Sequence, residues 1–208
     1  GEILASIAGA LKSRSGSLTL NGETFLPKSP SQAIKKKIAY CSSDRKKDGL
    51  FLGRPIFENL TSPALNAISN YGFNFGATEQ NFSKNLAKEF LIDVRRMFDE
   101  SGLLSGGNQQ KVALGKWLSI KPDVLLVNEP TRGVDVGAKS EIYQRMRDLA
   151  ARGITIIFAS TDIQEITYLP DRVITFYRGM MIDEHRLENI QTPTILKEIT
   201  DPFNETNL

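Results

Sequence analysis

The chain has 208 residues, 40% of them hydrophobic, which is enough to bury the core of one large domain or two small ones. Lys and Arg (26) nearly balance Asp and Glu (24), so we interpret the basic runs Lys35–Lys37 and Arg45–Lys47 as solvated surface and not as a nucleic-acid-binding face. The single cysteine, Cys41, excludes an intrachain disulfide and fits a reducing compartment. No apolar run approaches the length of a transmembrane helix.

The first strands are predicted from short apolar runs bounded by turn residues. Ile3–Ala8 is expected to form a strand, and Leu18–Leu20 a second one, followed by a turn at Asn21–Gly22. Ile38–Cys41 is expected to be a short buried strand. The abrupt opening GEILASIAG indicates a fragment of a longer chain, with the first strand of the sheet upstream.

Strands and helices alternate through the rest of the sequence. In chain order, the expected elements are a helix at Glu79–Phe98, a polar loop at Asp99–Leu103, a buried strand at Val124–Val127, an amphipathic helix at Ser140–Ala151 that stops at Arg152–Gly153, and strands at Ile154–Ala159 and Val173–Tyr177. This alternation predicts an α/β fold with a largely parallel sheet, and the helical middle predicts an inserted helical subdomain.

The stretch LLSGGNQQKVALGKWL, from Leu103 to Leu118, is an unusual way to begin a helix. Ser105 is a good N-cap, and the two glycines after it let the backbone approach a ligand closely, with the first-turn N–H groups pointing outward. These features favour an anion site. They also fit a plain helix cap after a loop, and on these residues alone both interpretations remain open.

Polar residues also follow the strand in VLLVNEPTRGVDVGAK, from Val124 to Lys139. This strand ends in Asn128–Glu129, which places both side chains at the carboxyl edge of a parallel sheet, where open α/β folds bind ligands. A carboxylate there can polarise a water or help to hold Mg²⁺. The alternative is that Glu129 only caps the turn made by Pro130.

Together, these two stretches resemble the ATP-binding subunits of ABC transporters, in which a signature motif, a helix, a Walker B strand and a D-loop follow one another. The segments SDRKKDGLF (Ser43–Phe51), LSGGNQQKVALGKWL and EPTRGVDVGAKSEIY are similar to the second nucleotide-binding domain of monosaccharide importers of the ribose, galactose and xylose type. The resemblance extends from GEIL to RVITFYRGMMIDE, nearly the whole chain. It implies the P-loop NTPase fold of ABC ATPases, with a mostly parallel sheet, an antiparallel β edge, and ATP and Mg²⁺ as cofactors.

The resemblance implies a single nucleotide-binding domain over residues 1–208. Its expected parts are a core at about 1–44 and 110–186, a helical subdomain at about 45–109 and a C-terminal tail at 187–208.

The resemblance assigns the unusual helix start to the surface that contacts the γ-phosphate of ATP held by the opposite domain. The residues of this signature motif are Ser105, Gly106, Gly107, Asn108 and Gln109. In the same way, Asp135 is identified as the D-loop aspartate and Glu129 as the general base that activates the attacking water.

The phosphate-binding loop departs from the family pattern. Gly9 stands where the loop should begin, but GALKSRSGSLTLNG follows at once and lacks the Gly-Lys-Ser/Thr that such a loop needs. A loop and a helix are expected to be missing between Gly9 and Ala10 or nearby, because a crossover between parallel strands needs about ten or more residues. The sequence leaves open whether this segment is deleted or disordered. Without it, the isolated chain is expected to bind Mg-ATP very weakly and not to hydrolyse it.

Three other positions are weakened relative to the family. Asn128 replaces the Walker B aspartate, so a weaker hold on Mg²⁺ and its waters is expected. Ser43 occupies the position of the Q-loop glutamine. Thr161 occupies the position of the switch histidine, and a hydroxyl cannot carry a proton as an imidazole does. The only histidine, His185, is interpreted as an exposed surface residue.

The preferred hypothesis is a domain that binds and hydrolyses ATP to power sugar import through a membrane ABC transporter, with its signature motif acting in trans on the partner domain's ATP. One alternative is a degenerate, non-hydrolysing ABC domain with a structural or regulatory role. Another is a soluble ABC-type ATPase of DNA repair or chromosome organisation, which the sequence does not favour because it has neither a long coiled-coil insertion nor a strongly basic surface.

The resemblance implies several partners and no nucleic acid. They are the N-terminal nucleotide-binding domain of the same polypeptide, the transmembrane permease subunits and, indirectly, a periplasmic or extracellular sugar-binding protein. A peripheral location on the cytoplasmic face of the inner membrane follows. The segment Leu50–Leu60, with Pro55, Phe57, Glu58 and Asn59, is expected to form part of a groove for a helix of the membrane subunit, or alternatively to pack the core of the subdomain.

Overall fold

The computed structural model describes residues 1–13, 15–65 and 76–203, apart from the side chains of 76–78. It forms two compact units, Gly1–Ala159 and Ser160–Leu208. None of the helices within the described ranges combines the length and the apolar character that crossing a membrane requires. The single domain over 1–208 and the helical subdomain at 45–109 stay predictions.

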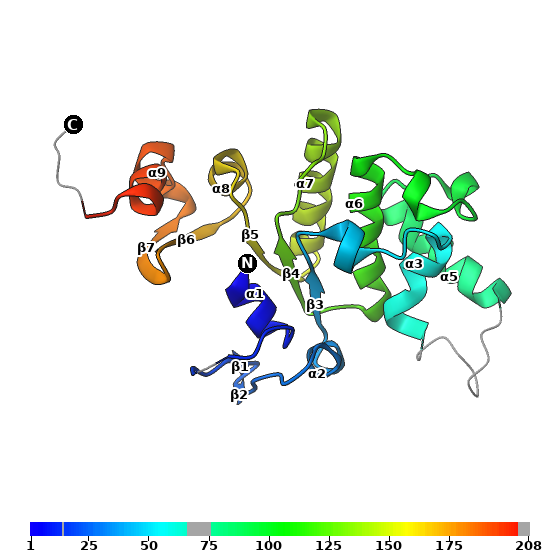
Figure 1. Cartoon of the computed structure of the whole chain (residues 1–208), viewed down its shortest axis with the longest axis horizontal. Helices are drawn as coiled ribbons and strands as arrows, with labels where there is room; N and C mark the ends of the chain where they lie inside the picture. Colours follow the sequence, from blue (N-terminus) through cyan, green and yellow to red (C-terminus); the bar gives the residue numbers. More distant parts are fainter. Residues whose placement is uncertain (14, 66–75, 204–208) are drawn as a thin grey trace. The chain divides into compact units, whose positions relative to one another are not determined.

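The first unit is built around a parallel sheet of three strands, β3 (Ile38–Cys41), β4 (Val124–Asn128) and β5 (Thr155–Ala159), with β4 in the middle (Figure 1). Residues 125–127 of β4 are fully buried. Parallel strands covered on both faces are apolar throughout, and this is why β3 and β4 could be recognised from short apolar runs, whereas β5 is partly exposed. The three predicted strands are confirmed, with β5 beginning one residue later than expected.

The prediction of a strand at Ile3–Ala8 is wrong. Residues Glu2–Ile7 form a helix, α1, which lies beside the sheet in Figure 1. Leu4 and Ala8, one helical turn apart, are buried in one cluster with Leu126 of β4. A short apolar run fits a strand or a buried helix equally well by composition, and here the helical spacing of the buried residues decides.

Gly9 closes α1, and it does not follow a strand as the first glycine of a phosphate-binding loop must. Its φ angle of 69° lies in the left-handed region, and its N–H donates to Ser6 O at 3.0 Å. The N–H of Ala10 donates to Ala5 O at 2.8 Å. These two bonds form the Schellman ending of a helix, for which glycine is the preferred residue. Within residues 1–13 the chain continues from this helix end without a break, and the absence of the family's loop and helix between Gly9 and Ala10 stays a prediction.

Gly9→Ala is expected to lower the free energy of unfolding by more than about 2 kcal/mol. The added Cβ would lie 2.7 Å from the backbone carbonyl of Ser29, and a left-handed backbone is itself costly for alanine. The matched control is Gly153→Ala. Gly153 ends α7 (Val136–Ala151) with the same hydrogen-bond pattern at a φ of 93°, but nothing lies within 4 Å of an added Cβ. Its expected loss is only about 1–2 kcal/mol, and equal losses in urea unfolding of the two variants would contradict the close approach of Ser29.

An antiparallel hairpin follows α1, formed by β1 (Thr19–Leu20) and β2 (Glu23–Thr24). The two residues between the strands, Asn21 and Gly22, have φ angles of 52° and 84°. Positive values at both positions are what a two-residue type I′ hairpin turn requires, so the predicted strand and turn are confirmed. A short helix, α2 (Pro30–Lys35), then leads into β3.

The chain between β3 and β4 is mainly helical, as predicted. Its described elements are η1 (Arg45–Gly49), α3 (Ile56–Thr61), η2 (Ser62–Ala64), α5 (Gly76–Glu89), η3 (Val94–Arg96), η4 (Ser101–Leu103), α6 (Gly106–Gly115) and η5 (Lys116–Ile120). The helices α3, α5 and α6 are grouped beside the sheet (Figure 1). A Cβ at Gly115 would lie 3.2 Å from Phe90 and 3.4 Å from Leu60, so the core between these helices is tightly filled.

The helix predicted at Glu79–Phe98 ends earlier, at Glu89. Leu91 has a φ of 52°, and the N–H groups of Leu91 and Ile92 donate to carbonyls of the preceding turn. This is the same type of ending as at Gly9, with leucine in the place of glycine. The sequence therefore held neither the glycine nor the proline that normally signals a helix end.

The helix predicted at Ser140–Ala151 begins earlier, at Val136. Asp135 caps it by accepting a hydrogen bond from the N–H of Ala138 at 2.9 Å. Valine and glycine, the first two residues of α7, are weak helix formers, and the N-cap compensates for them.

The described residues of the second unit form a helix, a hairpin, a 3₁₀ turn and a further helix. In chain order they are α8 (Ile163–Tyr168), β6 (Arg172–Tyr177) paired antiparallel with β7 (Met180–Arg186), η6 (Leu187–Asn189) and α9 (Thr192–Thr200). The predicted strand at Val173–Tyr177 is confirmed as part of β6. The interpretation of His185 as an exposed residue is wrong, because its side chain on β7 is only 10% exposed.

Candidate functional site

The carboxyl end of β4 carries Asn128 beside the start of α1. A Cβ at Gly1 would lie 2.8 Å from Asn128 Nδ2, so the beginning of α1 packs directly against this amide. The Asn128 side chain also forms a hydrogen bond with Tyr40 of β3. Burial raises the pKa of the Tyr40 hydroxyl, and this hydrogen bond acts in the opposite direction. Asn128 is thus a neutral group held at the edge of the sheet between two elements.

Glu129 follows in a constrained backbone conformation. Its φ is 55°, a left-handed value that is uncommon for a residue with a side chain. Its N–H donates to Ala159 O at 2.7 Å, which extends the pairing of β4 with β5 beyond the last strand residue. Its carbonyl accepts from the N–H of Arg132 at 3.3 Å and closes the turn at Pro130. Such conformations persist where the surrounding structure fixes them, and they gather at functional sites. The role of Glu129 as general base stays a prediction.

The predicted N-cap of the unusual helix is confirmed. Ser105 is exposed, α6 begins at Gly106, and the Ser105 hydroxyl accepts a hydrogen bond from the N–H of Asn108 at 3.4 Å. Asn108 itself is half-buried. The distance is long for a hydrogen bond, so this cap holds the helix start only weakly.

The two glycines at this helix start are required by packing within the chain. A Cβ at Gly106 would lie 2.8 Å from the carbonyl oxygen of Gly133. A Cβ at Gly107 would lie 2.5 Å from the Cβ of Ala138 in the first turn of α7. Real Cβ contacts do not occur at these distances, so α6 can meet the start of α7 only without side chains here. Close approach of the backbone is the expected use of glycine, and the structure shows the partner to be another part of the same chain.

Asp135, the predicted D-loop aspartate, lies at this contact. It is exposed and caps α7, and its carboxylate would be 3.6 Å from a Cβ at Gly107. The signature motif and the D-loop, which the resemblance assigned separately, are therefore adjacent in the first unit.

Gln109 differs from the expected arrangement of the signature motif, because its side chain is only 4% exposed. Its amide nitrogen lies 3.4 Å from the carbonyl oxygens of both Ser101 and Gly102, to which it donates. Its amide oxygen accepts from Arg45 Nε at 3.5 Å. The Gln109 side chain thus joins α6 to η4 and η1, and its predicted contact with ATP stays untested.

Arg45 is the residue of this region that the sequence did not single out. Its guanidinium donates to Arg132 O at 2.5 Å and to Gly133 O at 3.2 Å, in addition to Gln109. Burial lowers the pKa of Arg45, and the neighbouring Asp44 opposes this shift. Asp44 also caps η1 by accepting hydrogen bonds from the N–H groups of Lys46 and Lys47, which fixes the helical turn that carries Arg45. Arg45 had been interpreted as part of a solvated basic run, and its acceptors are mostly backbone carbonyls that no sequence pattern reveals.

Two predicted positions remain, those of the Q-loop and of the switch. Ser43, at the Q-loop position, is half-buried between the end of β3 and η1. Thr161, at the switch position, is exposed and precedes α8 in the second unit. Their predicted roles stay untested. Cys41 is buried, and burial raises the pKa of its thiol to about 11, which disfavours the reactive thiolate form.

The sequence profile of the family described as ABC transporter matches residues 2–132, which include α1, β3, α6, β4 and Glu129. This chain belongs to the ABC transporter family. The predicted family is thereby confirmed.

Curated relatives of this ABC protein are named as ATP-binding proteins of ribose import. The chain is 43% identical over 183 residues to the "Ribose import ATP-binding protein RbsA" of Streptococcus agalactiae serotype III (strain NEM316), a match that covers 88% of the chain and 37% of that relative. It is 42% identical over 178 residues to the protein of the same name from Lactococcus lactis subsp. lactis (strain IL1403), covering 86% of the chain and 36% of the relative. The ABC chain thus spans little more than a third of the length of these relatives.

Solved structures confirm the predicted fold of the ABC ATPases. A nucleotide-free ATP-binding cassette from an ABC transporter superposes with a TM-score of 0.77 at 19% identity, over 90% of this chain and 78% of that one. A dimeric cassette in a post-hydrolysis state, bound to ADP and Pi, superposes with a TM-score of 0.75 at 21% identity, over 89% and 79% of the two chains.

Proposed function

We propose that this chain is an ATP-binding and ATP-hydrolysing domain that powers sugar import through a membrane ABC transporter. Its signature motif would act in trans on ATP held by the partner domain. The observation that carries the proposal is the start of α6, where an exposed serine caps a helix whose first two glycines pack against the D-loop segment. The relatives named as ribose import ATP-binding proteins support a monosaccharide as cargo.

The start of α6 suits a phosphate that gains charge during hydrolysis. The Ser105 hydroxyl can donate its proton to a phosphate oxygen while its own oxygen still accepts from Asn108. The N–H groups of the first helical turn and the helix dipole favour negative charge at the same end. Donors fixed in advance stabilise the transition state more than the ground state, so this surface would act mainly on turnover.

The chain's own nucleotide would lie at the carboxyl end of β4. Mg²⁺ bound with ATP would neutralise phosphate charge there, with Asn128 offering an amide oxygen and Glu129 a carboxylate that orients the attacking water. In the full protein, the phosphate-binding loop is proposed to begin at Gly9, where a loop and a helix are expected to be missing from this sequence. Ser43 would be a weaker member of this site, and the role of Thr161 at the switch position stays a prediction. The weak binding of Mg-ATP expected for the isolated chain stays a prediction.

The proposed partners are those of a sugar importer. They are an N-terminal nucleotide-binding domain in the same polypeptide, transmembrane permease subunits and an external sugar-binding protein, with the domain at the cytoplasmic face of the inner membrane. The share of the relatives that the chain covers, 37%, leaves room for a second domain of similar size.

ATP-dependent sugar uptake by proteoliposomes tests this proposal. They would contain the full-length protein and its permease subunits, with the binding protein outside, and ribose would be the first sugar tried. Absence of ATP hydrolysis in the assembled transporter would contradict it. The alternative, a degenerate domain, is favoured by the neutral Asn128 at the metal position. The degenerate-domain alternative predicts that only the partner domain's ATP is hydrolysed, so that each full-length protein hydrolyses one ATP in a single turnover. The preferred proposal predicts two.

Part of the segment expected to form the membrane-subunit groove is buried, and the groove itself stays a prediction. Four residues of the segment Leu50–Leu60 are buried and pack the unit itself: Leu50, Ile56, Asn59 and Leu60. Backbone hydrogen bonds join residues 52–57 to residues 97–102. These two segments and the residues that flank them expose three large apolar side chains: Phe51 (61%), Phe98 (62%) and Leu103 (70%). We define these three residues as the apolar surface, and we propose that it contacts the membrane subunit.

Phe51→Asp is expected to reduce sugar uptake about 10-fold or more while ATP hydrolysis continues. Exposed aromatic anchors carry a large share of interface energy, and a carboxylate cannot be desolvated there. Uptake and hydrolysis would be measured on the same proteoliposomes. The control is Leu11→Asp, which places the same charge at an exposed leucine after α1 (46% exposed). Normal uptake by the Phe51 variant would remove the apolar surface from the proposal.

A further inference from the structure

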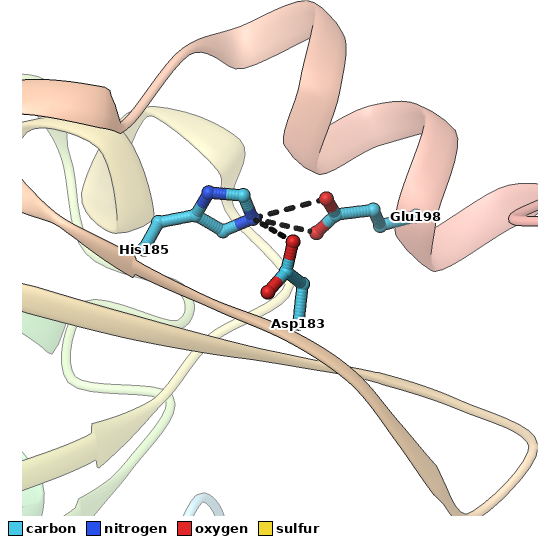
Figure 2. A group of neighbouring side chains, drawn as sticks. All are labelled: Asp183, His185 and Glu198. Atoms are coloured by element: carbon cyan, nitrogen blue, oxygen red, sulfur yellow. Dashed lines mark hydrogen bonds and ion pairs between the residues drawn. The ribbon is translucent and has the colours of Figure 1, made fainter.

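Three side chains with metal-ligating atoms converge in the second unit (Figure 2). His185 Nε2 lies 2.9 Å and 3.0 Å from the two carboxylate oxygens of Glu198, and 4.0 Å from Asp183 Oδ2. Asp183 and His185 are two residues apart on β7, so both face the same side of the hairpin, and α9 brings Glu198 to that side.

The cluster is supported by a neighbouring hydroxyl. Thr175 of β6 donates to Glu198 Oε2 at 2.7 Å and accepts from the backbone N–H of Asp183 at 3.2 Å. The side chains of His185 and Glu198 are 10% and 13% exposed, whereas that of Asp183 is 61% exposed. Two of the three ligating groups are therefore held in place by packing, and the third lies at the solvent side, where an ion would enter.

We propose that Asp183, His185 and Glu198 form a binding site for a divalent transition-metal cation, with Zn²⁺ as the first candidate. An imidazole nitrogen with two carboxylates suits zinc and its neighbours, whereas Mg²⁺ and Ca²⁺ prefer oxygen ligands alone. The two carboxylates also balance the charge of a divalent ion. The site does not depend on the proposed nucleotide chemistry, since none of its three ligands is among the residues proposed to bind ATP or Mg²⁺.

Small side-chain movements would bring the three groups to the distances of a metal site. Ligand atoms at about 2.1 Å from a metal are separated by roughly 3.0 Å at right angles and roughly 3.4 Å in a tetrahedron. His185 Nε2 and the Glu198 oxygens, now at hydrogen-bond distance, would move apart by roughly 0.4–0.5 Å in a tetrahedral zinc site. Asp183 Oδ2 would have to approach by roughly 0.5–1 Å, which a side-chain rotation of this exposed residue allows. Water would complete the coordination on the open side. Thr175 would orient Glu198, as groups behind metal ligands commonly do.

Calorimetric titration of the metal-free chain with zinc chloride tests the site. Wild type is expected to bind one zinc ion per chain, and Glu198→Gln and His185→Ala are expected to weaken binding by about 100-fold or more. The matched control is Glu184→Gln. Glu184 lies between Asp183 and His185 but shares the exposed face of the hairpin with Ile174, and it pairs with Arg172 at 3.3 Å. The affinity of the Glu184→Gln variant for zinc is expected to stay at the wild-type level.

Thermal unfolding with and without zinc gives a second readout. Zinc is expected to raise the Tm of wild type and of Glu184→Gln, but not that of Glu198→Gln. Glutamine keeps the size of the side chain and can still accept the Thr175 hydrogen bond, so circular dichroism of this variant should match wild type. Lack of saturable zinc binding by wild type would leave only a hydrogen-bonded His185–Glu198 pair and overturn the proposal. Equal binding by wild type and Glu198→Gln would place the zinc elsewhere and also overturn it.

Discussion

Ser105→Ala in the full-length protein is expected to lower ATP turnover by about 100-fold or more, with a smaller effect on the KM for ATP. The hydroxyl is lost from the surface that would meet the γ-phosphate as its charge develops, so the change falls on the transition state. The cost in stability should be about 1 kcal/mol or less, because the capping bond to Asn108 is long at 3.4 Å. Steady-state hydrolysis by the assembled transporter measures the first effect, and urea unfolding the second.

Asp93→Ala serves as the control for the loss of a cap. Asp93 caps η3 through the N–H of Arg95, and turnover should stay at the wild-type level when it is removed. Wild-type turnover in Ser105→Ala would remove the trans role of the signature serine. Gly107→Asp is a poorer test, since its side chain would collide with Ala138 whether or not ATP is present.

Arg45→Ala is expected to lower ATP turnover by about 100-fold, although Arg45 is not expected to touch ATP. Its guanidinium holds two carbonyls of the segment before α7 and the Gln109 side chain of α6 at once. Without it, the signature motif and the D-loop lose a shared anchor, and a small misplacement of catalytic groups is enough for such a loss. We therefore propose Arg45 as a positioning residue, and this proposal rests on the proposed ATPase function.

Arg45→Lys separates positioning from charge. A lysine keeps the positive charge but cannot present the planar set of donors that reaches these acceptors, so most of the loss should remain. The control is Lys46→Ala, which removes an exposed charge from the same turn and should leave turnover unchanged. Full activity of Arg45→Lys would show that charge alone matters. If wild type also hydrolyses no ATP, the result contradicts the proposed ATPase function. Loss of activity only in the Arg45 variants supports the positioning role.

The sheet could be predicted from sequence more reliably than the helices around it. The strands β3 and β4 are apolar runs bounded by turns, and burial on both faces leaves few other structures for such runs. Residues 3–8 are also a short apolar run, but they form α1, because buried helices and buried strands share this composition. The end of α5 was missed for a different reason: Leu91, just after the helix, adopts the left-handed conformation that usually requires glycine.

In the candidate site, local interactions could be predicted from the sequence, and interactions between distant segments could not. The Ser105 cap is a local feature, set by residues adjacent in sequence, and it was predicted correctly. The role of Arg45 depends on carbonyls of residues 132 and 133, which only the folded chain brings near. Backbone acceptors exist at every residue, so no residue type in the sequence could point to them. The glycines were noticed, but the sequence could not show that α7 is what they approach.

The contact of Gly106 and Gly107 with the start of α7 has an evolutionary consequence. A methyl group on either glycine needs a shift of the segment around Gly133 or Ala138, and such a shift is costly where two segments are already in close contact. Changes in the two segments are therefore not independent, and a substitution in one is tolerated only in a lineage that has already altered the other. We therefore expect the helix start and the segment before α7 to be inherited together, even though most of α6, η5 and β4 separate them along the chain.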